Sequence, residues 1–403
     1  MTDSCTLNQH LSPSAEAAYL VNDLRFFCLH RLPLARGLQE YGCPIRVLAP
    51  VTERDRSARN RLEDLGLNVS AIPLSKSGAN PAEETETMCA VREILSNSDP
   101  LLLHNVGFKA VFHGSHAARL STASPAVVNH VNGLGHMYAA NGLREFVSRQ
   151  LMNMAFASSF RIVGPQEIIV QNPDDEELLL KSAFAPRDRI SVVLGSGVDT
   201  DEFHPPVPAR SSDRSRAPVV LFAGRLIWTK GVGEFVEAAR VLRNEFREAR
   251  WVIVGEPDEG NVGRVPRDQV TDWADEARIE WWGWREDMAS VYREADVVCL
   301  PTTYREGIPK VLIEAAASEI PLVATDMPGC REIVRDGENG LLVPPGDGDA
   351  LIDALRTLTA DPTLRRRMGK RGRRIVEEEF SEASVVAQTL KIYEKVLAAR
   401  HPS

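Results

Sequence analysis

Short apolar runs alternate with longer amphipathic stretches twice along this chain of 403 residues, and a polar segment separates the two series. This alternation is typical of parallel sheets covered by helices, because an amphipathic helix returns the chain between buried strands. The separating segment, 205–218 (PPVPARSSDRSRAP), has no apolar periodicity and is typical of a linker. The sequence therefore predicts an α/β fold with two doubly wound, Rossmann-like domains in tandem.

The two domains are expected at 1–204 and 219–380, followed by a C-terminal helix at 381–403. The sequence does not decide whether this helix crosses back to the first domain. Ligands bind outside the carboxyl ends of the strands in such sheets, so we expect a cleft there. The expected strands are 18–22, 45–49, 101–104, 126–131, 161–163, 190–194, 219–223, 251–254, 279–282, 297–301, 322–324 and 341–343. The expected helices are 32–41, 56–65, 83–96, 143–158, 233–246, 288–294, 309–319, 347–358 and 362–380.

Charge and cysteine usage exclude several classes of protein. The formal net charge of -9 argues against nucleic acid as the main partner, because phosphate binding needs a basic surface. The six cysteines are scattered without a C-x-x-C pair, so we expect reduced thiols in a cytoplasmic protein. Residues 1–15 do not resemble a signal peptide, and no apolar run is long enough to cross a bilayer.

The first motif that points to chemistry is 222–231 (FAGRLIWTKG). A strand ends there, Gly224 permits a tight turn, and Arg225 and Lys230 follow at the carboxyl edge of the predicted sheet. Two cations at such an edge suit a diphosphate, with Arg as a fork and Lys as a point charge. The alternative is a pair of ordinary surface cations, since Arg and Lys are mostly exposed.

The second motif is 301–314 (PTTYREGIPKVLIE), in which Glu306 and Gly307 close a loop and Pro309 stands where a helix should begin. The free amides of that first helical turn favour an anion. Glu314 lies on an otherwise apolar stretch, where a carboxylate either faces a cleft or is costly to bury. A ribose diol could donate two hydrogen bonds to it, and the alternative is a position on the solvated face of the helix.

Two turns, 326–332 and 336–340, are expected at the same sheet edge, although turns are often only connections. Two Asp-x-Asp spacings, at 199–201 and 347–349, invite a metal interpretation. We interpret the second as a helix start with Asp347 or Asp349 near the N-cap, and the first precedes the linker. We expect no cofactor and no obligatory metal, with cations and helix amides stabilising the diphosphate instead.

Together the runs AGRLIWTKG, WWGWREDM, LPTTYREGIPKVLIEAAAS and PLVATDMPGCREIVRDGENGLLVPPGD resemble the donor domain of family 4 retaining glycosyltransferases, which have the GT-B fold. They follow the order and spacing of the family over about 150 residues. The resemblance implies a nucleotide-sugar donor, with UDP expected, and makes 219–380 the donor domain and 1–204 the acceptor domain. It also implies a site for the reacting centre formed by Glu306, Arg225, Lys230, His130 and Asn132.

By the same resemblance, Glu306 would hold hydroxyls of the transferred sugar, Glu314 the nucleotide ribose, and the loop 283–285 would lie near the base. The implied donor-binding set is Arg225, Lys230, Glu306, Gly307, Ile308, Pro309, Glu314, Gly283 and Arg285.

The first half resembles bacterial transferases that build capsule, O-antigen or N-linked glycans on a polyprenyl-diphosphate carrier. The resemblance to this branch is carried by DLRFFCLHRLPLA at 23–35, VVNHVNGLG at 127–135 and QNPD at 171–174, and GSGVDTDEFHP at 195–205 resembles the segment of the family that leads into the linker. It implies transfer of a hexose or N-acetylhexosamine to such an acceptor or another surface-glycan precursor. The implied acceptor-side residues are His30, Arg31, Asn132, Gly133 and Gly135.

Two places depart from the family pattern. Many members have a glycine-rich loop after the first strand that contacts the diphosphate, whereas this chain has VNDLRF at 21–26. The common His-Gly or His-Asp is replaced by Asn132-Gly133, with His130 two residues earlier and His136 four residues after Asn132. Residues two apart in a strand share a face, so His130 could face the cleft with Asn132, or it could be a buried structural histidine.

The resemblance implies a reaction that retains the anomeric configuration. No second carboxylate is evident in the first domain as a nucleophile, so the simplest hypothesis is attack on the same face, in which the leaving phosphate takes the acceptor proton. A lipid-linked acceptor would require peripheral contact with the inner face of the membrane, and 143–160 is either a surface helix suited to it or a core helix.

An oxidoreductase is disfavoured because no G-x-G-x-x-G follows a predicted strand. The remaining alternatives are a catalytically silent binder or scaffold, and the same chemistry on a soluble acceptor.

Overall fold

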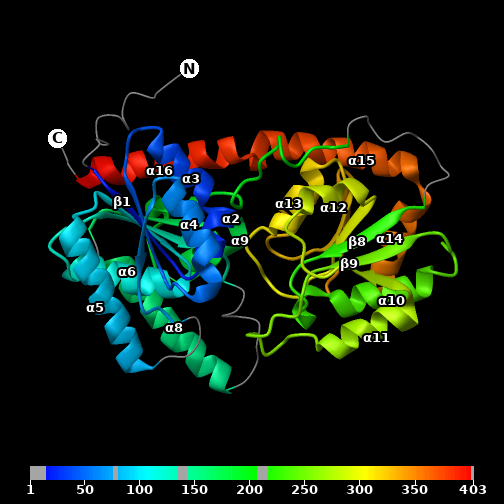
Figure 1. The fold of residues 1–403 in the computed structure, drawn as a ribbon, viewed down its shortest axis with the longest axis horizontal. Coiled ribbons are helices and arrows are strands. Elements are labelled where there is room, and N and C mark those ends of the chain that lie inside the picture. Colours follow the sequence, from blue (N-terminus) through cyan, green and yellow to red (C-terminus); the bar gives the residue numbers. More distant parts are fainter. Residues whose placement is uncertain are drawn as a thin grey trace. The chain divides into compact units, whose positions relative to one another are not determined.

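A computed structural model describes residues 15–75, 80–134, 143–162, 164–182, 184–206 and 217–400, and the chain forms two compact units (Figure 1). Unit 1 comprises Met1–Val193 and Val385–Ser403, and unit 2 comprises Leu194–Ser384. The division falls before the expected boundary at residue 204, because the amide of Val198 bonds to the Phe380 carbonyl within unit 2. Most of the expected linker, 207–216, lies outside the described residues.

Unit 1 contains a seven-stranded parallel sheet in the order β3-β2-β1-β4-β5-β6-β7. Its strands are β1 (Ala17–Val21), β2 (Ile45–Ala49), β3 (Asn68–Ala71), β4 (Leu102–Val106), β5 (Ala126–Val131), β6 (Gln166–Val170) and β7 (Ile190–Val192). Its helices are α2 (Leu24–His30), α3 (Leu32–Gln39), α4 (Arg56–Asp64), α5 (Pro81–Ser98), α6 (Phe108–Leu120), α8 (Leu143–Ile162), α9 (Pro173–Lys181) and α16 (Glu382–Arg400).

The central strand β1 is buried on both faces, as its unbroken apolar sequence AAYLV requires. Tyr19 and Val21 pack with α2, α3 and α16, whereas Ala18 and Leu20 pack with α5 and α6 (Figure 1). This alternation places helices on both sides of the sheet.

One expected strand of unit 1 is wrong. Residues 161–163 were expected to form a strand, but α8 continues to Ile162 and the strand is β6. Phe156 and Phe160 are four residues apart and both buried, so the apolar run follows helical spacing. Gly164-Pro165 then separates the helix from the strand.

Unit 2 contains a six-stranded parallel sheet in the order β10-β9-β8-β11-β12-β13. Its strands are β8 (Val219–Ala223), β9 (Arg250–Val254), β10 (Ile279–Trp281), β11 (Val297–Leu300), β12 (Leu322–Thr325) and β13 (Gly340–Val343). Its helices are α10 (Val232–Leu242), α11 (Arg267–Ala277), α12 (Met288–Glu294), α13 (Lys310–Ala317), α14 (Gly348–Ala360) and α15 (Pro362–Ile375).

The strand order of each unit reverses at one point, between β1 and β4 in unit 1 and between β8 and β11 in unit 2. Open parallel sheets bind ligands at the carboxyl ends of the strands beside such a reversal. This position directs attention to the loops after β8 and β11. No helix in the described part of the chain is long and apolar enough to span a membrane.

Candidate functional site

The loops after β8 and β11 are joined by backbone contacts. Gly231 has a φ of +79°, and a Cβ there would lie 2.0 Å from the carbonyl oxygen of Pro301. The carbonyl of Thr229 accepts hydrogen bonds from the Thr302 hydroxyl (3.0 Å) and the Thr303 amide (2.9 Å). The absence of a side chain at Gly231 therefore brings Lys230 beside the β11 loop.

Lys230 and Glu306 form an ion pair in which each side chain is 11% exposed. Burial by itself would lower the pKa of Lys230, but the charge of Glu306 outweighs it, and the pKa is raised above its ordinary value. The Lys230 ammonium also lies 5.7 Å from the centre of the Tyr304 ring. The structure thus brings together a predicted cation and the first predicted carboxylate, and keeps the lysine charged at neutral pH.

Arg225 lies at the rim of the same edge with a different environment. Its side chain is 49% exposed, and its Nη1 donates to Asp258, which follows β9, at 2.8 Å. Asp258 was not predicted from the sequence. A half-exposed guanidinium held by one carboxylate can turn to a ligand more easily than the buried ammonium of Lys230.

Glu314 is buried on α13 and is 6% exposed, so the interpretation that it lies on a solvated face is wrong. Its Oε2 accepts a hydrogen bond from the Tyr292 hydroxyl at 3.1 Å. Burial raises the pKa of Glu314 to about 7, which the nearby positive charge of Lys310 partly opposes. A carboxyl group with this pKa can change its protonation state near neutral pH.

The loop that leads into α13 is packed against the loop after β12. A Cβ on Gly329, whose φ is +94°, would lie 2.3 Å from the Gly307 carbonyl. Ile308 is 7% exposed, and Pro309 is the N-cap of α13 with no side-chain capping bond. The N-cap side chain therefore makes no hydrogen bond to the first turn of α13, which begins directly after the Glu306 loop.

The predicted base loop follows β10. The Gly283 carbonyl accepts a hydrogen bond from the Gly255 amide at 2.8 Å, which ties this loop to the end of β9. Arg285 forms a two-point ion pair with Asp287 (2.7 and 2.6 Å). The guanidinium also lies 5.8 Å from the centre of the Trp282 ring, so Arg285 is held within its own loop.

In unit 1, the backbone amides of the loop after β1 donate hydrogen bonds to a side chain of the same loop, unlike those of a phosphate-binding loop. The Asp23 side chain caps α2 by accepting hydrogen bonds from the amides of Arg25 (2.8 Å) and Phe26 (3.0 Å). A carboxylate therefore occupies the donors that a phosphate would need. This agrees with the departure from the family pattern seen in VNDLRF.

A buried cation organises the carboxyl edge of unit 1. Arg31 is 2% exposed, and its Nη2 donates to Asn132 Oδ1 at 2.8 Å and to His130 Nε2 at 3.0 Å. Gln171 Nε2 lies 3.3 Å from the same ring nitrogen. Because both neighbours are N–H donors, His130 Nε2 must be the acceptor, and burial and the charge of Arg31 hold the pKa of His130 well below its ordinary value.

This arrangement favours a structural role for His130, which is 2% exposed, over direct contact with a substrate. Asn132 is half-buried and is held by Arg31. Burial also lowers the pKa of Arg31 to about 10, and among the described residues no carboxylate pairs with it. Arg31 thus links His130 and Asn132 through hydrogen bonds from one guanidinium nitrogen.

A second cluster of buried side chains, which was not predicted from the sequence, packs against His130. Tyr393 of α16 hydrogen-bonds to His104 Nδ1 (2.5 Å) and to the Tyr19 hydroxyl (3.1 Å). The His104 ring stacks on His130 with centroids 5.6 Å apart. These residues are far apart in sequence, so only tertiary structure could bring them together.

The remaining predicted acceptor-side residues are His30, Gly133 and Gly135. The ring of His30 packs on Phe26 with centroids 4.4 Å apart, and its carbonyl accepts from Arg31 at 3.0 Å. Gly133, two residues after the end of β5, has a φ of +114°. Gly135 and His136 lie outside the described residues.

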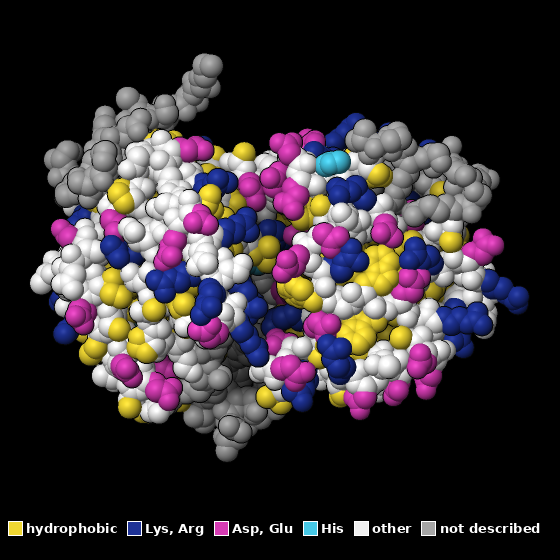
Figure 2. All heavy atoms as spheres, viewed as in Figure 1, with side chains coloured by type: hydrophobic (Ala, Val, Ile, Leu, Met, Phe, Trp, Pro, Cys, Tyr) yellow, Lys and Arg dark blue, Asp and Glu magenta, His cyan; other side chains and the backbone are white. Residues whose placement is uncertain are grey.

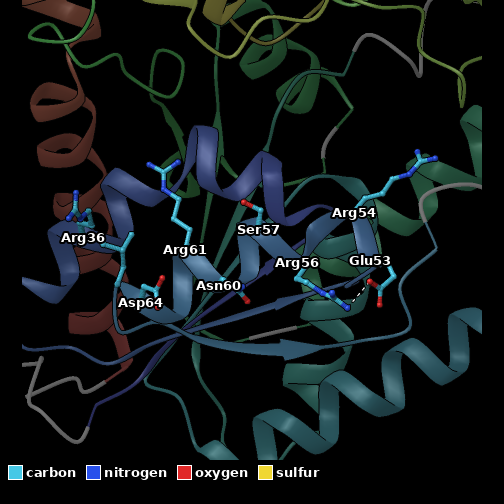
Figure 3. A pocket seen from close by; sticks show the side chains of 9 residues that line it. Arg36, Glu53, Arg54, Arg56, Ser57, Asn60, Arg61 and Asp64 are labelled. Carbon is cyan, nitrogen blue, oxygen red and sulfur yellow. Dashed lines mark ion pairs between the residues drawn. The ribbon is translucent and has the colours of Figure 1, made fainter.

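A separate hollow of about 920 Å³ lies over α3 and α4 and is lined by exposed side chains. Figure 3 shows Arg54 pointing away from Arg36 and Arg61, while Arg56 pairs with Glu53 at 2.8 Å. The arginines do not converge on one point, so this hollow is not built like a site.

The Asp-x-Asp spacings have local roles. The Asp347 side chain caps α14 by accepting from the Ala350 amide (2.9 Å), as predicted. Asp199 accepts from the amides of Asp201 and Glu202. Within the described ranges, no three His, Cys, Asp or Glu side chains are grouped in a way that could hold a metal ion.

Comparison with known proteins bears on this site. Residues 217–361 match the family described as "Glycosyl transferases group 1". The chain is 24% identical over 376 residues to N,N'-diacetylbacillosaminyl-diphospho-undecaprenol alpha-1,3-N-acetylgalactosaminyltransferase of Campylobacter jejuni, a match covering 91% of this chain and 95% of that one. It is 33% identical over 254 residues to D-inositol 3-phosphate glycosyltransferase of Corynebacterium glutamicum, covering 59% of each chain. A crystal structure of an Anabaena protein in complex with UDP is similar in fold, with a TM-score of 0.75 at 17% identity, covering 94% and 99% of the two chains.

Proposed function

The chain belongs to the group 1 glycosyltransferases with a GT-B fold and transfers a sugar from a nucleotide-sugar donor, and from that premise we propose its donor, acceptor and site. The donor is a UDP-linked hexose or N-acetylhexosamine. The acceptor hydroxyl is on a polyprenyl-diphosphate-linked sugar or another surface-glycan precursor. The transfer retains the anomeric configuration.

One observation carries this proposal: the Lys230–Glu306 pair and the buried Glu314 lie on loops and a helix that follow β8 and β11. Lys230 stabilises the negative charge that develops on the leaving diphosphate, and Arg225 contributes from the rim. Lys230 is in place before the reaction, and Arg225 turns from Asp258 to the diphosphate when the donor binds, so both cations are positioned as the sugar–phosphate bond breaks.

The remaining contacts with the donor are made by residues at the carboxyl edge of the unit 2 sheet. Glu306 accepts hydrogen bonds from hydroxyls of the transferred sugar, and phosphate oxygens bind at the N-terminal turn of α13, which begins after Pro309. Glu314 accepts hydrogen bonds from the ribose diol, and the loop with Gly283 and Arg285 lies near the base. Gly307 and Ile308 shape the backbone between these contacts.

On the acceptor side, Asn132 faces the acceptor while Arg31 and His130 hold it in place. The acceptor class is supported by the undecaprenyl-diphosphate-linked substrate in the name of the Campylobacter relative. The inositol phosphate in the name of the Corynebacterium relative favours the alternative of a soluble acceptor. Both acceptors carry phosphate, so a test must include one of each.

The first experiment is thermal-shift binding of UDP, GDP, ADP and their sugars to the full chain and to Arg225→Ala and Glu314→Ala. We expect stabilisation by UDP compounds that falls in both variants. Arg356→Ala is the control, because Arg356 is also a partly exposed arginine of unit 2 whose guanidinium is ion-paired, with Glu245 and Asp353. Stabilisation by no nucleotide would leave a catalytically silent relative as the better explanation.

The second experiment measures sugar transfer from the donor so identified. The acceptors are an undecaprenyl-diphosphate-linked sugar and inositol phosphate. Product from the lipid-linked acceptor alone supports the proposal, and product from inositol phosphate alone overturns its acceptor half. Slow hydrolysis of the donor without an acceptor would show that the protein is catalytically active and not only a nucleotide-sugar-binding protein.

A further inference from the structure

Helix α15 is the most basic element of a chain whose net charge is -9. Its 14 residues, PTLRRRMGKRGRRI, include seven basic side chains and no acidic one. Three of these cations are engaged. Arg371 pairs with Glu338 (3.0 Å), Arg373 with Glu377 (2.6 Å), and Arg365 donates to the carbonyls of Leu358 and Thr359.

The other four cations are exposed and form no ion pair with any residue that the structure describes. They are Arg366, Arg367, Lys370 and Arg374. With 3.6 residues per turn, the four fall within about 100° of one another around the helix axis. We call these four residues the α15 basic face.

The opposite side of α15 is fixed to unit 2. Met368 is 2% exposed and Ile375 is 0% exposed. A Cβ on Gly369 would lie 1.9 Å from the Glu319 carbonyl, so the helix packs closely against the end of α13. The basic face therefore lies on the side of α15 opposite the core of unit 2, and Figure 1 shows α15 as a helix at the edge of that unit.

We propose that the α15 basic face docks the protein onto a membrane surface of anionic phospholipids. Clusters of four or more basic residues on an amphipathic helix are attracted to such surfaces. Figure 2 shows basic and acidic side chains side by side over much of the face that it draws, whereas α15 has seven basic side chains and no acidic one. The proposal deepens the proposed function, because a lipid-linked acceptor is reached only from the membrane surface.

The composition of this face distinguishes a membrane from other anionic partners. No large apolar side chain of α15 is exposed, whereas the core of a protein–protein interface is apolar and aromatic. The helix has no aromatic residue on which a nucleic acid base could stack. An anionic lipid surface needs charge alone, so docking is electrostatic, without insertion, and sensitive to salt.

The test is sedimentation of the full-length protein with vesicles of phosphatidylglycerol and phosphatidylcholine, or of phosphatidylcholine alone. We expect binding only to the anionic vesicles, and release when NaCl is raised from 0.1 to 1 M. The variant Arg366→Gln/Arg367→Gln/Lys370→Gln/Arg374→Gln should bind about a hundredfold or more weakly, because each basic residue near the surface strengthens binding roughly fivefold. Glutamine keeps helix propensity close to that of Arg and Lys.

The matched control is Arg36→Gln/Arg54→Gln/Arg56→Gln/Arg61→Gln, which removes the same charge from exposed arginines of the α3–α4 hollow. An equal loss in the control would overturn the proposal, as would equal binding of the wild type to both vesicles or to neither. Binding of a single-stranded RNA oligonucleotide that the α15 variant alone loses, without vesicle binding, would assign the face to nucleic acid. UDP binding on the same samples reports separately on the proposed function and on folding.

Discussion

Lys230 and Glu306 are each 11% exposed, so removing one charge leaves its partner desolvated and unpaired. We expect Lys230→Met to lower the free energy of unfolding by about 3–5 kcal/mol. The double variant Lys230→Met/Glu306→Leu should regain most of that loss, because no lone charge remains buried, while sugar transfer stays lost in both. Urea unfolding and a sugar-transfer assay measure the two effects, and a double variant as unstable as the single one would contradict this account.

Glu314 makes stability depend on pH. Burial raises the pKa of this carboxyl group from 4.5 to about 7, so the folded protein binds the proton more tightly than the unfolded chain. Its contribution is fully present below pH 4.5 and is lost as pH rises through 7, by about 3 kcal/mol at most. Urea unfolding of the wild type and Glu314→Gln from pH 4 to 8 should show this slope only in the wild type.

The same residue makes donor binding depend on pH in the opposite direction. If the ribose hydroxyls donate to Glu314, the nucleotide binds the ionised carboxylate. Affinity for UDP should then rise about tenfold between pH 6 and 8, as the carboxyl group loses its proton. Isothermal calorimetry of UDP binding to the wild type and to Glu314→Gln separates this effect from the protonation of UDP itself. If affinity changes equally with pH in the two proteins, Glu314 does not bind the ribose.

At the scale of elements, the junction between the β8 and β11 loops depends on one glycine. Gly231→Ala forces a Cβ to 2.0 Å from the Pro301 carbonyl at a φ of +79°. Gly337 has a similar φ of +74° but nothing within 4 Å of the added Cβ, so Gly337→Ala isolates the backbone strain of roughly 1–2 kcal/mol. We expect Gly231→Ala to lose clearly more stability than this control in thermal unfolding, together with UDP binding.

Most elements could be predicted because each has a local pattern. The apolar runs of β2, β5 and β8 were predicted at their observed bounds, Ile45–Ala49, Ala126–Val131 and Val219–Ala223. The strand β3 (Asn68–Ala71) was missed, because it is a polar edge strand whose residues are exposed or half-buried. Helices α2, α6, α9 and α11 were missed as well, and each lies between two strands of its sheet.

At the scale of the whole molecule, unit 1 is completed by the last helix of the chain. Tyr393 of α16 bonds to His104 and Tyr19, and Val396 and Leu397 are buried in the same core. We expect truncation after Ser384 to destabilise unit 1 while unit 2 stays folded. Calorimetry should then show a lowered or missing transition for unit 1, with UDP still stabilising the other transition, and two unchanged transitions would contradict this.

The sequence by itself determined the α/β class, the family and the order of the donor motifs, because periodicity and motif spacing are local properties of the chain. It also indicated which residues would meet at the carboxyl edge of β8 and β11. Only the tertiary structure decided that Glu314 is buried, that Lys230 is paired with Glu306, and that Asp258 holds Arg225. It alone placed Tyr393 beside His104. Burial and pairing depend on neighbours distant in sequence, and these set the charge and pKa of each group.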